Sequence, residues 1–448
     1  LIPIIRRIPT IEYRSMAWPG GSHSIIKHLL SCVILVSSLC NVHGSMTSAH
    51  QTAIRIPSKI WRAAASQHQE KIHSLLKPGL TPLDHPLNVG LRKQYKKENS
   101  KDWATALDPK NPIYNFLIEY YGLKGAKGVR KLCRWSPSPG LLMQCQSNNI
   151  ETVDQLHEFS AAYTQETIDA PTMYDSILLE GAEENDFGST IHLRGATVVD
   201  GEGVLYSPAA FYGKGDPSRR EDSIRLSSPF LWYQSILQQT LKADPILHCY
   251  GLHEWAMQYQ PEGAPTPPSG KYQAHLPLRV SREVINETVG RKGVSCTHVD
   301  ALRFFAEDAL PLNKFGGPLK RDDQIKLEQP ACVHAHMDLL KLALKLTPFG
   351  DAQLLQSVLE AALEARKLDV AASPYDASAY GVGVVPIDTP EGRSQYREDQ
   401  IKLMKRVEPV RKNLLGAYSN LLRIAFDGSI LELGKTRLPS KSKQAQVA

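Results

Sequence analysis

The stretch DAQLLQSVLEAALEARKLD, residues 351–369, decides the fold class. Its apolar side chains recur at helical spacing and form one stripe: Leu354, Leu355, Val358, Leu359, Ala362, Leu363 and Leu368. A helix with such a stripe must bury it against other elements of the same body. Weaker patterns of the same kind predict further helices at 56–76, 113–121, 150–165, 174–184, 229–241, 246–259, about 298–308, 322–346 with a break at Pro330, and 397–422.

One segment favours β-structure instead. Residues 189–206 carry branched apolar side chains around Gly195 and the pair Asp200-Gly201, a pattern that predicts a β-hairpin. Loops are expected at 77–112, 131–140, 211–222 and 260–278. The predicted fold class is therefore mainly α (α+β with a minor β-hairpin): one helix-rich body over residues 55–430, followed by a basic flexible tail, 431–448.

The N-terminal region has the features of a targeting sequence. After Met16, a short basic part leads into the apolar run Leu29–Leu39, and residues 1–45 resemble a signal peptide. The run is too short to span a bilayer, so no membrane span is predicted; a buried helix is the alternative. Residues 46–54 lack acidic side chains and resemble a transit peptide. Together these segments predict an organelle, with a plastid favoured over the secretory pathway and the mitochondrion.

The distribution of charge and the spacing of the cysteines argue against several classes of protein. Residues 1–80 hold nine Lys or Arg against two Glu, so the net charge of +6 arises there and the remaining chain is nearly neutral. A broad nucleic-acid-binding surface on the body is not indicated. The five cysteines beyond residue 45 are widely spaced and contain no CxxC pair, which argues against a disulfide framework or a structural zinc site.

Side chains that bind metals or transfer protons are concentrated between residues 248 and 338. Histidine can ligate zinc or iron, and nearby carboxylates can complete such a site or activate water. The predicted metal ligands are His253, His298 and His334, with Zn or Fe as the metal. The predicted catalytic carboxylates are Glu254, Asp300 and Asp338. The predicted substrate-binding residues are Trp255, Arg303, Tyr375 and Asp376. The competing interpretation is that each histidine is hydrogen-bonded separately within a helix bundle.

Several of these segments resemble one protein family. The segments are GLHEWAM at 251–257, CTHVDALRFF at 296–305, LEQP at 327–330, Val333-His334 with Met337-Asp338-Leu339, and SPYD at 373–376. They are similar to a bacterial and algal family labelled 3-methyladenine DNA glycosylase, and the similarity extends from about Trp61 to about Val407. His336 falls where other members tend to have Asn, so the resemblance favours the other three histidines as ligands.

The resemblance implies a hydrolase that cleaves the N-glycosidic bond of alkylated purines in DNA, with an Asp or Glu that activates water. Two features of the sequence argue against that function. The chain has no helix-hairpin-helix turn of the Leu-Pro-Gly-Val-Gly kind, and its body is not basic. A second hypothesis is therefore a small-molecule enzyme with a His, Asp and Glu pocket, either with or without a divalent metal. A third is a non-catalytic helical scaffold, which predicts that the three histidines lie apart.

Overall fold

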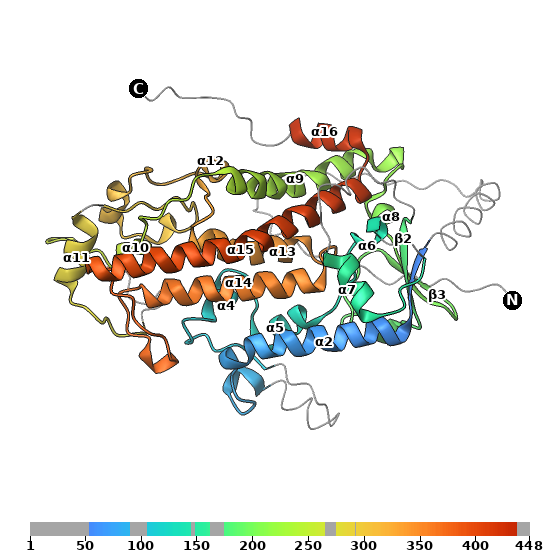
Figure 1. The fold of residues 1–448 in the computed structure, drawn as a ribbon, viewed down its shortest axis with the longest axis horizontal. Helices are drawn as coiled ribbons and strands as arrows, with labels where there is room; N and C mark the ends of the chain where they lie inside the picture. Colours follow the sequence, from blue (N-terminus) through green and yellow to red (C-terminus); the bar gives the residue numbers. More distant parts are fainter. Residues whose placement is uncertain are drawn as a thin grey trace, which may run out of the picture.

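Long helices form the body of the molecule in the computed structural model, which describes residues 53–89, 105–144, 148–161, 174–264, 275–291 and 293–436. Four of them lie side by side (Figure 1): α9 (Arg220–Lys242), α13 (Val333–Leu346), α14 (Ala352–Ala371) and α15 (Pro390–Ala425). The prediction of a mainly α fold is confirmed. In the described part of the chain, no helix is both long and apolar enough to cross a membrane. Residues 1–45 of the predicted presequence lie outside the described residues.

Local sequence signals begin and end the long helices. The Asp351 carboxylate accepts a hydrogen bond from Leu354 N at 3.2 Å and caps α14. The Thr389 hydroxyl accepts one from Gly392 N at 3.0 Å, so Thr389 to Gly392 is an ordinary start of α15. Pro330 separates the short α12 (Gln324–Leu327) from α13, as the sequence predicts.

A small sheet lies at one end of the helices (Figure 1). Its strands are β1 (Ala53–Ile56), β2 (Ser176–Glu180), β3 (Ala196–Val199) and β4 (Gly203–Tyr206), in the order β1-β2-β4-β3. β1 pairs with β2 in parallel, and the other pairs are antiparallel. The predicted hairpin is thus confirmed as β3–β4. Residues 53 and 54, predicted to be transit-like, belong to β1.

The prediction of a helix at 174–184 is wrong, because these residues contain β2. The segment SILLE is apolar and almost wholly buried between β1 and β4. A short apolar run of this kind satisfies helix and buried strand equally well in sequence. The pairing with β1, more than 100 residues earlier in the chain, made it a strand.

Seven further helices of the described chain lie outside this group of four. They are α2 (Ser58–Leu76), α4 (Asn115–Glu119), α5 (Gly125–Cys133), α6 (Leu141–Gln144), α7 (Val153–Ala161), α8 (Pro208–Tyr212) and α16 (Gly428–Thr436). Three of them correct the predictions. α5 reaches into the predicted loop 131–140. α8 and the start of α9 occupy the two ends of the predicted loop 211–222, and α16 extends the body beyond residue 430 into the predicted flexible tail.

The end of the molecule away from the sheet contains less regular structure than predicted. α10 (Leu252–Ala256) and α11 (Arg282–Gly290) lie there (Figure 1). The predicted helix 246–259 shrinks to α10, because Tyr250 and Gly251 adopt left-handed backbone angles, with φ of 52° and 69°. The predicted helix 298–308 is replaced by irregular chain and two 3-10 segments, 302–304 and 307–312. The side chain of Asn313 holds this chain through Cys296, whose N donates to its Oδ1 at 2.9 Å.

His68 on α2 gives the fold a pH-dependent stability. Its ring is buried, with Nε2 2.8 Å from Leu132 O and Nδ1 2.9 Å from Gln356 Nε2, and burial lowers its pKa to about 4. The unfolded chain therefore binds a proton between pH 6.5 and about 4 that the folded chain does not. We expect His68 to cost about 3 kcal/mol of stability as the pH falls through this window, estimated from about 1.4 kcal/mol per pKa unit.

Urea unfolding at several pH values measures this effect. His68→Gln should make the free energy of unfolding less dependent on pH between 6.5 and 4. The contributions of the other buried histidines to this dependence should remain. An unchanged slope in His68→Gln would show that His68 does not titrate with a lowered pKa.

Candidate metal centre

The three predicted histidines come together from three separate parts of the chain. His253 lies on α10, His298 on the irregular segment before residue 302, and His334 on the first turn of α13. The His253 and His334 rings are edge to face with centroids 4.3 Å apart, and the His298 and His334 rings are stacked at 4.8 Å. The scaffold hypothesis predicted that the three histidines lie apart, and this prediction is wrong.

His253, His334 and Asp369 form a first set of potential metal ligands. Each offers one ligand atom, and these atoms lie within 4.8 Å of one another. The tightest contact is between His253 Nε2 and Asp369 Oδ1, at 2.7 Å, and both side chains are fully buried. His334 is partly exposed, whereas His253 and Asp369 are buried. Two histidines and one carboxylate are typical of metal sites that keep coordination positions open.

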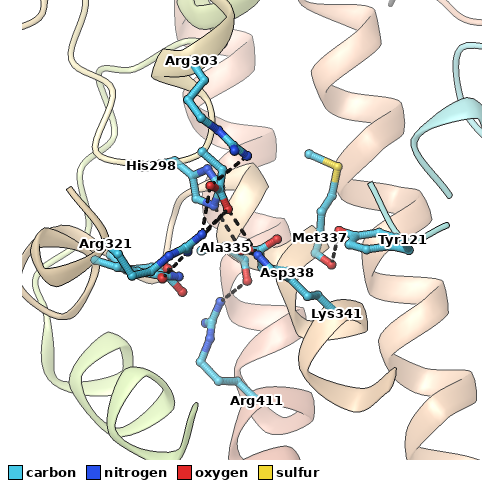
Figure 2. A network of polar contacts seen from close by, with 12 residues as sticks. Tyr121, His298, Arg303, Arg321, Ala335, Met337, Asp338, Lys341 and Arg411 are labelled. Atoms are coloured by element: carbon cyan, nitrogen blue, oxygen red, sulfur yellow. Dashed lines mark hydrogen bonds and ion pairs between the residues drawn. The ribbon is translucent and has the colours of Figure 1, made fainter. Parts of the chain in front are cut away.

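His298, Glu328 and Asp338 form a second set, also with one ligand atom each within 4.8 Å of the others. His298 Nε2 lies 3.3 Å from Asp338 Oδ2, and Figure 2 draws both side chains. Glu328 follows α12 directly and is buried, with Oε2 2.5 Å from Gln324 Nε2. The Gln329 side chain fixes this turn by accepting from Ile246 N at 3.0 Å and from Ala331 N at 2.8 Å.

The sequence grouped the three histidines as the metal ligands, whereas the structure divides them between two sets that carboxylates complete. Bonds from Zn²⁺ to nitrogen or oxygen are about 2.0–2.2 Å long, so two ligands of one ion are roughly 3–4 Å apart. Small shifts of side chains bring either set into that range. Nδ1 of His253 and Nδ1 of His298, the ring nitrogens that do not face the carboxylates, are buried and lack a hydrogen-bond partner among the described residues.

The charge state of the histidines differs across the centre. Burial opposes protonation of His253, but the Asp369 carboxylate outweighs it and raises the pKa of His253 to about 10. Burial lowers the pKa of His334 well below its usual value, and the neighbouring His253 and His298 lower it further. His334 is therefore neutral near pH 7 and has a lone pair available for a metal.

The three predicted catalytic carboxylates each contact a cationic or imidazole group. Glu254 Oε1 is 3.0 Å from Arg366 Nη1, which also lies 2.5 Å from Asp369 Oδ2. Although burial opposes ionisation of Asp338, its hydrogen bond with His298 and the nearby Lys341 keep its pKa at about 2. Asp338, whose pKa is held this low, is a weak proton acceptor at neutral pH.

Asp300, the third of these carboxylates, lies between three cations. Arg303 Nη2 is 3.0 Å, Arg321 Nη2 3.2 Å and Lys341 Nζ 3.2 Å from its oxygens. Burial raises the pKa of Asp300, but Lys341 and Arg321 outweigh it and lower the value. The three cations surround the His298 side of the centre (Figure 2).

The predicted substrate-binding residues have mostly structural contacts. Trp255 is fully buried, and its Nε1 donates to Ala372 O at 2.8 Å. Tyr375 is buried and its hydroxyl accepts from Gln258 Nε2 at 2.9 Å, while Asp376 caps the turn at Ser378 N. Arg303 alone is largely exposed, with its guanidinium over the Phe304 ring.

His336 lies on the same helix as His334 but outside both sets. It is fully buried, and its Nδ1 is 3.2 Å from Arg411 Nη2. Burial and the positive charge of Arg411 lower its pKa well below the usual value.

Sequence reasoning missed Asp369, Arg366 and the ligand role open to Glu328. The sequence of residues 351–369 contains a signal for Arg366 and Asp369. Arg366 and Asp369 continue the apolar stripe at the spacing 355, 358, 362, 366 and 369, which predicts that both face the interior. Charged residues in that position are rarely buried unless they are paired, so they mark a site or an ion-pair network.

No protein-family model, no curated protein and no solved structure matches this chain. The geometry of the centre is therefore the basis for the function proposed below.

Proposed function

We propose that this chain is a metal-dependent enzyme acting on a small molecule, with a divalent metal bound by His253, His334 and Asp369. The observation that carries the proposal is the meeting of these three side chains from α10, α13 and α14. The His253–Asp369 pair and the neutral, partly exposed His334 supply nitrogen and oxygen ligands that suit Zn²⁺ or Fe²⁺. Because the Asp369 carboxylate raises the pKa of His253 to about 10, a metal at this pair would displace the proton from His253 Nε2.

The metal determines the reaction class. Zn²⁺ in such a site would lower the pKa of a bound water to near 7 and supply hydroxide for hydrolysis. Fe²⁺ held by two histidines and a carboxylate would suit chemistry with dioxygen. In either case Arg366 would orient the Asp369 carboxylate, because it binds Oδ2 and leaves Oδ1 facing His253. Arg366 also contacts Glu254.

DNA glycosylase activity stays a separate prediction that rests on the resemblance of the sequence segments. This activity needs one of Glu254, Asp300 and Asp338 as the base that activates water. Each of them is paired with a cationic or imidazole side chain, which makes it less suited to that role. Release of an alkylated purine from methylated DNA by the purified, metal-free chain would establish the glycosylase.

Elemental analysis of the full chain, expressed without a histidine tag, is the direct test of the metal proposal. We expect at least one equivalent of Zn or Fe after dialysis against metal-free buffer. The bound metal should be lost when His334 or Asp369 is replaced. A folded chain that binds neither metal when either is added would refute the proposal.

A further inference from the structure

The second set of ligands lies directly beside the first. His334 belongs to the first set and stacks on His298 of the second, with nearly parallel rings at 18° and centroids 4.8 Å apart. His334 and Asp338 are one turn apart on α13, so a single helix turn contributes a ligand to each set. Any ion in the second set would therefore be bound by a ring that stacks on His334, a ligand of the first set.

Glu328 is the residue that a structural role explains least well. Its carboxylate is buried and has no cation within ion-pair distance among the described residues; its hydrogen bond comes from the neutral amide of Gln324. A buried carboxylate without a cation is costly, and a metal ion is one of the groups that remove this cost. Asp338 adds a second carboxylate, and its nearest cation, Lys341 at 3.8 Å, is shared with Asp300.

His298 supplies the third, nitrogen ligand. The ring is buried, its Nε2 faces Asp338, and Nδ1 is buried without a partner in the described part of the chain. The set thus has one nitrogen and two carboxylate donors. This composition suits a hard or borderline divalent cation.

We propose that His298, Glu328 and Asp338 bind a second divalent ion, so that the chain carries a two-metal centre with the His253–His334–Asp369 site. The inference rests on the proposed function and extends it. Two adjacent ions act together on one substrate, because one activates the attacking water while the other stabilises the leaving oxygen. Hydrolysis of an ester or phosphoester is the reaction class that such a pair supports.

Metal stoichiometry tests this second site separately from the first. The full chain is stripped with a chelator, dialysed against buffered zinc, and analysed for bound metal. We expect two equivalents in the wild type and one in Glu328→Gln, whose amide oxygen can still accept from Gln324. Asp338→Asn should also bind one equivalent. His336→Asn, on the same helix but facing Arg411, should bind two.

The outcomes separate the two proposals. One equivalent in the wild type, retained in Glu328→Gln, would refute the second site and leave the first. Two equivalents in Glu328→Gln would refute the second site as well. Loss of all metal in a Glu328→Gln chain with native circular dichroism would show one shared site and overturn the two-metal centre. No metal in the wild type would refute both.

Discussion

His334→Ala is expected to weaken metal binding at the His253–His334–Asp369 site by at least about 100-fold, because even outer partners of metal ligands are worth about 10–100-fold. His334 is the partly exposed ligand and the ring that contacts both other histidines. Its removal leaves the buried His253–Asp369 pair in place, so the fold should change little. Competition against a chromophoric chelator, followed with Co²⁺, measures the affinity.

His336→Asn is the matched control for this experiment. It alters a histidine two residues away on α13 that faces Arg411 and belongs to neither ligand set. We expect its Co²⁺ affinity to remain within about threefold of the wild type. Equal affinities in the wild type and His334→Ala would remove His334 from the metal site.

The second large effect is on stability, and it concerns Arg366. This side chain is buried, and its guanidinium contacts Glu254 Oε1, Asp369 Oδ2 and, through Nε at 3.0 Å, Pro112 O. Arg366→Met leaves Glu254 buried without its cation, and Asp369 keeps only His253. Breaking a buried ion pair by removing one partner costs about 3–5 kcal/mol, and we expect a loss of unfolding free energy of that size.

Urea unfolding compares this variant with Arg406→Met. Arg406 pairs with Glu364 on α14, but its side chain is more than half exposed, so its loss should cost less than about 1 kcal/mol. A similar small cost for Arg366→Met would mean that Glu254 and Asp369 find other partners, and would remove the ion-pair network as a source of stability.

Local sequence patterns were sufficient for much of the helical frame. The stripe of 351–369, the break at Pro330 and the cap at Thr389 each depend on residues within a few positions of one another. Periodicity and capping report such local geometry directly. The same reasoning failed for residues 174–184 and 298–308, where distant contacts determine the backbone: pairing with β1 in the first case, and the side chain of Asn313, which holds the chain just before the second.

The sequence by itself therefore determined that this protein is a mainly helical body, and it predicted His253, His298 and His334 as candidate metal ligands. Only the tertiary structure decided how they group. His253 meets Asp369 across 116 positions of sequence, and His298 meets Asp338 across 40. Ligand sets are completed by such long-range contacts, which depend on how α10, α13 and α14 pack. Periodicity can predict that Asp369 faces the interior, but it does not predict that His253 is its partner.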